Sequence, residues 1–243
     1  MKNLVFGSTG LIGNAFCKLN HKENSFLYSS TKHSKKNIYW NLNKDLKHFP
    51  IKKVKNCFFF ASPRMLNKNF NNDKFKNEYY WLKNVIKNIK IENFIYVSSS
   101  SIYYKKNHKI GRVKRLCETL ILKNKKLFKN YQIWRPFNLV GNNPEYSDHF
   151  HIILFNLIFE KKVNTYEFHG NGLDVRGYSD VNDFVKKLLS YSKKKLSFIM
   201  DYGNKNQITI NDMIVLYNKY YYKKYKKKLI PSFLSNKKNI NII

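Results

Sequence analysis

Short apolar segments alternate with longer amphipathic segments through the first 140 residues, and this alternation restricts the chain to few folds. The first apolar segment, residues 3–6, is predicted to be a strand, and a glycine-rich turn follows it directly. Further strands are predicted at residues 25–28, 37–40, 56–60, 94–98 and 131–136, and helices at about 11–20, 77–89 and 111–123. Strands that alternate with helices pair in parallel, because a parallel connection needs a crossover and the crossover helix covers the sheet. The pattern therefore predicts an α/β fold.

The alternation becomes less regular after about residue 141. Helices are predicted at 148–160, 181–191 and 210–222, and strands at 164–168 and 197–200. We expect residues 1–140 to form one domain, to which strand elements return from the C-terminal part, and residues 141–243 to form mostly a second, smaller lobe. No Pro- or Ser-rich linker separates the two parts, so we expect them to pack as one body with a cleft between them.

The formal net charge of +31 raises the question of a polyanionic partner, either a nucleic acid or a membrane surface. Only five of the 46 basic residues are arginine, and the lysines are spread along the chain amid many Asn, Ile, Phe and Tyr residues. Lys, Asn, Ile, Phe and Tyr all use A/T-rich codons, so a genome biased toward A and T explains the charge without a polyanionic partner. We expect no nucleic acid partner, although residues 220–228 mix tyrosines with lysines as a nucleic-acid surface does. An RNA-associated protein stays as an alternative.

The three cysteines, Cys17, Cys57 and Cys117, are scattered and form no C-x-x-C pair. Neither a disulfide framework nor a metal site is predicted from them, and a reducing cytoplasm is expected. The N-terminus reaches Gly7 before an apolar signal segment forms, and no apolar run approaches the ~18 residues that a membrane helix needs. We expect a cytoplasmic protein without a membrane partner.

The turn after the first predicted strand carries a glycine at every third position. Glycines in such a turn let the backbone approach a pyrophosphate closely, and the start of the following helix supplies N–H groups and a positive dipole. The strand-turn-helix context therefore predicts dinucleotide binding. The residues expected to contact the dinucleotide are Gly7, Ser8, Thr9, Gly10, Leu11, Ile12 and Gly13.

The end of the second predicted strand bears on the choice of dinucleotide, because an acidic residue there would bind the ribose of NAD. Residues 28–36 contain no acidic residue and carry serines, a threonine and lysines instead. Hydroxyls and lysines suit a 2′-phosphate. We expect Ser29, Ser30 and Lys32 to contact the cofactor, which favours NADP(H), with NAD(H) as the alternative.

Four further motifs follow the glycine loop in order. They are the run Ser98-Ser99-Ser100-Ser101-Ile102-Tyr103, the pair Lys114-x-x-x-Glu118, the segment Arg135-Pro136-Phe137-Asn138-Leu139-Val140-Gly141, and residues 170–183 around Arg176. Together the five motifs resemble those of the extended short-chain dehydrogenase/reductases of the NAD-dependent epimerase/dehydratase family, which act mainly on nucleotide sugars. The resemblance covers nearly the whole chain. It implies a Rossmann-type, doubly wound parallel sheet with a small C-terminal α/β substrate lobe.

The resemblance implies a role for each matching residue. Ser99 matches the catalytic Ser/Thr that hydrogen-bonds the reacting sugar oxygen, and Lys114 matches the lysine that binds the nicotinamide ribose and lowers the pKa of a catalytic tyrosine. Further cofactor contacts are implied for Asn41, Leu42, Ala61, Ser62, Lys114 and Pro136. Substrate contacts are implied for Ser100, Asn138 and Arg176, with the arginine on the diphosphate. The helices predicted at 77–89 and 111–123 lie where family dimers pair, so a homodimer is one alternative for the oligomeric state.

One position departs from the family's pattern. The family places its tyrosine four residues before the lysine, one helical turn away, so that the charge of the lysine favours the phenolate. Ile110 occupies that position here and cannot exchange a proton. Either Tyr103 or its neighbour Tyr104 supplies the phenol, or the chain binds the dinucleotide with little turnover, because a general acid/base contributes typically about 10²–10⁴ in rate.

We expect an enzyme, an NAD(P)-dependent oxidoreductase or epimerase that transfers a hydride between a nucleotide-linked sugar and a nicotinamide. In this hypothesis Ser99 polarises the sugar oxygen and Tyr103 moves the proton. The alternatives are a catalytically impaired dinucleotide-binding protein, motivated by Ile110, and an RNA-associated member of the same fold.

Overall fold

The computed structural model describes residues 2–20, 26–30, 37–63, 76–141, 165–169, 171–205, 207–228 and 230–234. The chain divides into two compact units. The first unit comprises residues 1–137 and 180–202, and the second comprises residues 138–179 and 203–243.

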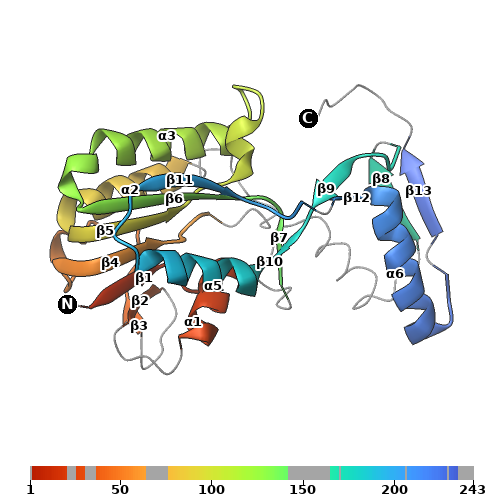
Figure 1. The fold of residues 1–243 in the computed structure, drawn as a ribbon, viewed down its shortest axis with the longest axis horizontal. Coiled ribbons are helices and arrows are strands. Elements are labelled where there is room, and N and C mark those ends of the chain that lie inside the picture. Colours follow the sequence, from red (N-terminus) through yellow and green to blue (C-terminus); the bar gives the residue numbers. More distant parts are fainter. Residues whose placement is uncertain are drawn as a thin grey trace. The chain divides into compact units, whose positions relative to one another are not determined.

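A seven-stranded sheet, parallel throughout, forms the centre of the first unit (Figure 1). Its strands are β1 (Asn3–Phe6), β2 (Phe26–Ser30), β3 (Asn37–Tyr39), β4 (Lys53–Phe59), β5 (Lys90–Val97), β6 (Asn130–Pro136) and β11 (Phe198–Tyr202). The strands follow the order β11-β6-β5-β4-β1-β2-β3, so the direction of winding reverses between β1 and β4. Ligands of doubly wound sheets bind at the carboxyl ends of the strands beside such a reversal. The α/β class and the Rossmann-type sheet predicted from the sequence are confirmed.

Helices cover both faces of this sheet (Figure 1). Helices α1 (Leu11–Leu19) and α5 (Val181–Ser192) pack together on one face, and α2 (Lys76–Asn88) and α3 (Lys109–Lys123) pack together on the other. Short 3-10 turns lie between the main elements at η1 (Leu46–His48), η3 (Ser100–Tyr103) and η4 (Lys125–Leu127). Helix α5 and strand β11 come from the segment beyond residue 140 and belong to the first unit, because β11 pairs in parallel with β6.

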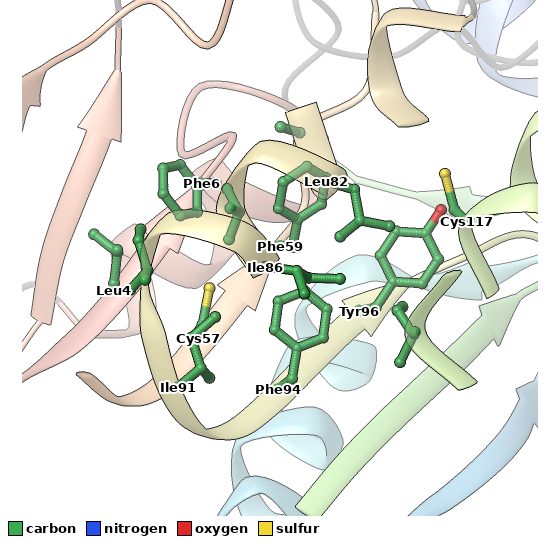
Figure 2. Packing of buried hydrophobic residues seen from close by; sticks show 14 of the residues in the cluster. Leu4, Phe6, Cys57, Phe59, Leu82, Ile86, Ile91, Phe94, Tyr96 and Cys117 are labelled. Carbon is green, nitrogen blue, oxygen red and sulfur yellow. The ribbon is translucent and has the colours of Figure 1, made fainter. Parts of the chain in front are cut away.

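The core beneath α2 and α3 joins apolar residues of β1, β4 and β5 to the buried face of α2 (Figure 2). Its labelled members are Leu4, Phe6, Cys57, Phe59, Leu82, Ile86, Ile91, Phe94, Tyr96 and Cys117. Residues two positions apart in a strand, such as Cys57 and Phe59, share the side of the sheet that faces α2, and Leu82 and Ile86 recur at helical spacing in α2. Aromatic rings fill much of this layer, as in the contact of Phe59 with Tyr96.

The second unit is built from two-stranded sheets and one helix. Its elements are β7 (Leu139–Val140), β8 (Thr165–His169), β9 (Val175–Gly177), β12 (Gln207–Thr209), α6 (Ile210–Tyr225) and β13 (Ile230–Leu234), with β10 (Ser179–Asp180) at its boundary. Strand β8 pairs with β13, β9 with β12, and β7 with β10. A capping box between Thr209 and Asp212 begins α6, because each side chain satisfies a backbone N–H of the other. The helix predicted at 148–160 lies outside the described residues.

Candidate functional site

Two of the three glycines in the turn after β1 are required by the protein's own packing. Gly7 has a positive φ of 81°, and a side chain there would begin 2.5 Å from the backbone nitrogen of Ala61. A side chain on Gly13 would overlap the carbonyl oxygen of Gly7 and the backbone of Ser8. These two glycines hold the first turn of α1 tightly against the ends of β1 and β4.

Gly10 differs from the other two glycines. It has an ordinary extended backbone, and a Cβ built on it would find only the Gly7 oxygen, at a normal contact distance of 3.7 Å. Gly10 is the N-cap of α1 and has no side chain with which to cap the helix, and the first turn carries no acidic residue. Nothing in the packing of the described residues requires a glycine at position 10. The space beside it suits a ligand that approaches the backbone closely, and the bare helix N-terminus favours an anionic one.

The neighbouring strands end at the same edge of the sheet. Phe6 lies opposite Phe59 in β4 and opposite Ser29 in β2, so the segments after these strands meet the glycine turn. Ala61 and Ser29 are buried there, and Ser62 is exposed. Of the other expected cofactor residues on this side, Lys32 and the side chain of Ser30 lie outside the described part.

Four more glycine-turn residues and two residues after β3 belong to the expected cofactor set. Thr9, Leu11 and Ile12 are half-buried, and the buried hydroxyl of Ser8 has no hydrogen-bond partner among the described residues. After β3, the side chain of Asn41 accepts a hydrogen bond from the backbone of Asn43 at 3.0 Å, and Leu42 packs against the core. Asn41 and Leu42 thus follow the outermost strand on the β2 side of the sheet.

The serine run follows β5 and turns into η3. Ser99 caps this turn, since its Oγ accepts a hydrogen bond from the backbone of Ser101 at 3.1 Å. Ser98 Oγ donates to Glu118 Oε1 on α3 at 2.5 Å. Ser100 is half-buried, and the buried hydroxyl of Ser101 has no partner within the described ranges. Ser99 and Ser100 therefore lie at the carboxyl edge of the sheet, where the expected site is.

Lys114 is buried in α3 and forms an ion pair that the sequence analysis did not predict. Its Nζ lies 2.7 Å from Glu78 Oε1 on α2 and donates to the carbonyl oxygen of Val97 at 3.2 Å. Tyr96 donates its hydroxyl proton to the same Oε1 at 2.7 Å, and Ser62 Oγ donates to Oε2 at 2.9 Å. Two expected site residues, Lys114 and Ser62, are thus joined by a carboxylate between them.

A sequence signal for Glu78 exists. Glu78 stands four residues before Leu82 and eight before Ile86, on the stripe that α2 buries. A charged residue within such a stripe must find a partner, because an unpaired buried charge is costly. Which partner it finds depends on the helix packed beside α2.

The phenol candidates lie elsewhere. Tyr103 is about half exposed, and its hydroxyl lies 2.8 Å from the carboxylate oxygens of Asp201 and accepts a hydrogen bond from Arg135 Nη1 at 2.9 Å. Partial burial and the bond to Asp201 raise the pKa of Tyr103, while Arg135 opposes this rise. The ring of Tyr104 packs edge-on against His108. The structure thus brings the Tyr103 hydroxyl to Arg135 and Asp201, whereas the hydrogen bonds of Lys114 go to Glu78 and Val97.

The remaining expected residues are divided between the units. Pro136 ends β6 in the first unit, whereas Asn138 and Arg176 lie in the second. Asn138 has a positive φ of 32°, and its Nδ2 donates to the carbonyl oxygen of Gly177 at 3.1 Å. The Nε of Arg176 is buried without a hydrogen-bond partner among the described residues. The contact with Gly177 places Asn138 next to the strand that carries Arg176.

Three features of the described residues bear on the predictions about metal, membrane and nucleic acid. Within the described ranges, no group of three or more His, Cys, Asp or Glu residues could hold a metal ion. No helix in the same part of the chain is long and apolar enough to span a membrane. The tyrosine-lysine block enters α6 and continues past its end, with Tyr222 half exposed and Lys223 and Lys224 exposed.

The fold is shared with solved structures of nucleotide-sugar enzymes. UDP-N-acetylglucosamine 4-epimerase from Bacillus cereus matches with a TM-score of 0.75 at 18% identity, over 97% of this chain and 85% of that chain. UDP-glucuronic acid 4-epimerase from Bacillus cereus in complex with NAD matches with a TM-score of 0.74 at 20% identity, over 96% and 86%. TunA, an NAD-dependent NDP-hexosamine 5,6-dehydratase involved in tunicamycin biosynthesis, matches with a TM-score of 0.74 at 13% identity, over 97% and 85%.

The sequence itself matches no family model and no curated protein. The structural matches show that the chain has the fold of NAD-dependent nucleotide-sugar epimerases and dehydratases, although its identity to these three structures is 20% or less.

Proposed function

We propose that this chain binds a nicotinamide dinucleotide at the turn between β1 and α1 and acts on a nucleotide-linked sugar by hydride transfer. It is then an NAD(P)-dependent epimerase, dehydratase or reductase of the extended short-chain dehydrogenase/reductase family. The observation that carries the proposal is Gly10. A glycine that the protein's own packing does not need, at the start of an uncapped helix beside the switch point of the sheet, fits a pyrophosphate.

The residues of this site divide the work in the proposal. Gly7, Gly10 and Gly13 shape the turn that receives the pyrophosphate, and Lys114 offers an N–H to the nicotinamide ribose. Ser99 donates a hydrogen bond to the reacting sugar oxygen. Asn138 and Arg176 take the nucleotide diphosphate part of the substrate. When bound, the nicotinamide supplies the hydride acceptor or donor.

The choice between the two dinucleotides rests on opposing arguments. The lack of an acidic residue at the end of β2 favours NADP(H), because no carboxylate binds the ribose 2′-hydroxyl. The solved epimerase of the same fold in complex with NAD supports NAD(H), and so does the dehydratase described as NAD-dependent. We place NAD(H) first for this reason, and a direct comparison of affinities decides the question.

A second candidate function is dinucleotide binding without efficient turnover, and three residues favour it. Ile110 has no ionisable group, the Tyr103 hydroxyl is engaged by Asp201 and Arg135, and Lys114 is paired with Glu78. A chain with these features still binds the dinucleotide but lacks the phenol and lysine pair of the family.

The experiment that tests the proposed site is calorimetric titration of the full chain and of Gly10→Val with NADH and NADPH. Valine at position 10 should weaken the affinity about tenfold or more, because it fills the space that the pyrophosphate must enter. Its backbone strain is small, since Gly10 has φ −80° and ψ 178°. The control is Lys18→Ala, which removes a charge in the last turn of α1 and should leave the affinity unchanged.

Equal affinities of Gly10→Val and the parent would remove the glycine turn as the binding site. A panel of UDP-glucose, UDP-glucuronic acid and UDP-N-acetylglucosamine, followed by product analysis, then separates the two candidates. Conversion of a sugar establishes the enzyme, and binding without conversion establishes the second candidate.

A further inference from the structure

We propose that Glu78 is a positioning residue that cancels the charge of Lys114. As part of a neutral ion pair, Lys114 then donates a hydrogen bond to the dinucleotide but does not act as the cation that favours a phenolate. The inference rests on the proposed dinucleotide site. It concerns the ion pair of Lys114 with Glu78, the one that Lys114 forms among the described residues.

The pair lies between two helices and is shielded from water. Glu78 comes from the first turn of α2 and Lys114 from the middle of α3, and their side chains are 3% and 9% exposed. The two helices pack on the same face of the sheet. A buried pair at 2.7 Å interacts far more strongly than a surface pair, because little solvent screens it.

One of the three N–H groups of Lys114 is not used by the two hydrogen bonds described above. An ammonium group carries three N–H bonds, and two of them go to Glu78 Oε1 and to the carbonyl oxygen of Val97. Both oxygens of Glu78 are engaged in turn, because Oε1 also accepts from Tyr96 and Oε2 accepts from Ser62. The network holds the Lys114 side chain in one place and leaves a single N–H for a ligand.

The groups around the pair do not alter its net charge. Tyr96 on β5 and Cys117 on α3 are both buried (Figure 2). Burial, and after it the neighbours Cys117 and Glu78, raise the pKa of Tyr96 well above its usual value. Burial, followed by Glu78, raises the pKa of Cys117 to about 12. Both groups are therefore neutral near pH 7, and the nearby Glu118 is paired with Arg135.

The consequence concerns position 110, one helical turn before Lys114 on the same face of α3. A single positive charge nearby lowers a tyrosine pKa by roughly 1–3 units, and a neutral ion pair loses most of this effect. Ile110 and Glu78 therefore act in the same direction: Ile110 removes the phenol, and Glu78 cancels the charge that would favour its ionisation.

The test uses Ile110→Tyr as a reporter, with the phenol pKa measured by ultraviolet difference titration against the parent protein. With Glu78 present, we expect the introduced phenol to titrate at its ordinary value of about 10 or above. Adding Glu78→Gln should lower that pKa by about 1 unit or more, because Lys114 is then an unpaired cation. Adding Lys114→Met to this double variant should raise the pKa again.

Glutamine is a suitable replacement at position 78. Its carbonyl oxygen can accept the bonds from Lys114 and Tyr96, and its amide can donate to the hydroxyl of Ser62. The matched control is Glu92→Gln, which removes a carboxylate paired with Lys129 near the start of β5. It should leave the reporter pKa unchanged.

A reporter pKa that is the same with Glu78 and with Gln at position 78 overturns the inference and leaves Glu78 as a packing residue. A shift that Lys114→Met does not reverse also overturns it. The titration needs no dinucleotide, so a failure of the Gly10 experiment and a failure of this one are distinguishable.

Discussion

The guanidinium of Arg135 holds the carboxylate of Glu118 with two parallel hydrogen bonds, from Nε to Oε1 at 3.1 Å and from Nη2 to Oε2 at 2.7 Å. The hydroxyl of Ser98 donates to the same carboxylate. Three motifs distant in sequence, the serine run, the lysine helix and the arginine strand, therefore meet on one carboxylate. This contact fixes α3 against the ends of β5 and β6.

The first prediction concerns this contact. Glu118→Ala should lower the free energy of unfolding by on the order of 3 kcal/mol, because it leaves a largely buried guanidinium and the Ser98 hydroxyl without their acceptor. Arg135→Lys should also destabilise, since a lysine cannot form the two-pronged contact. Urea unfolding of both variants measures the effects. A lysine variant as stable as the parent would show that the fork geometry contributes nothing.

The second prediction separates the glycines of the first turn. Gly13→Ala should lower the free energy of unfolding by about 3 kcal/mol or more, because its methyl group overlaps rigid backbone at Gly7. Gly10→Ala should cost about 1 kcal/mol or less, since only an N-cap preference is lost. Thermal unfolding without ligand makes the comparison. Equal losses at both positions would contradict the assignment of Gly10 to a ligand.

The third prediction is a pH dependence at the start of α3. His108 Nδ1 accepts a hydrogen bond from the backbone of Gly111 at 3.1 Å, and burial, with Arg115 next, lowers the pKa of His108 below its usual 6.5. A histidine with a lowered folded pKa binds more protons when unfolded. Its contribution to stability is therefore complete above about pH 6.5 and is lost as the pH falls through the folded pKa.

The measurement is the melting temperature from about pH 7.5 to about pH 5 for the parent and for His108→Asn. Asparagine caps a helix without titrating in this range, so the variant should lose less stability on acidification. An identical acid loss in both proteins would assign the pH dependence to other groups.

The fourth prediction concerns Tyr103. Tyr103→Phe should retain the dinucleotide affinity and lose less than about 1 kcal/mol of stability, because the hydroxyl and its partner Asp201 are both exposed. The readout that bears on its catalytic role is turnover of a nucleotide sugar. A loss of about 100-fold or more would identify Tyr103 as the general acid/base, and unchanged turnover would remove it from the site.

Local pattern carried most of the fold. The short apolar runs of β1, β4 and β5 and the helical spacing of Leu82, Val85 and Ile86 are properties of neighbouring residues. The sequence alone therefore indicates these elements. The glycine turn after β1 is local in the same sense. The observed starts of two strands differ from the predicted ones. Strands β4 and β5 begin three and four residues before the predicted starts, because backbone pairing extends to Lys53 and Lys90, whose side chains are exposed.

The partners of charged groups depend instead on which elements pack side by side. The sequence by itself determined an α/β chain with a dinucleotide-type turn, and it marked Ile110, four residues before Lys114, as a departure from the family's pair. Only the tertiary structure decided that Lys114 meets Glu78, 36 residues earlier in the chain, and that Tyr103 meets Asp201, 98 residues later. A buried charge takes the nearest opposite charge that packing delivers, and no periodicity within a single helix or strand encodes that choice.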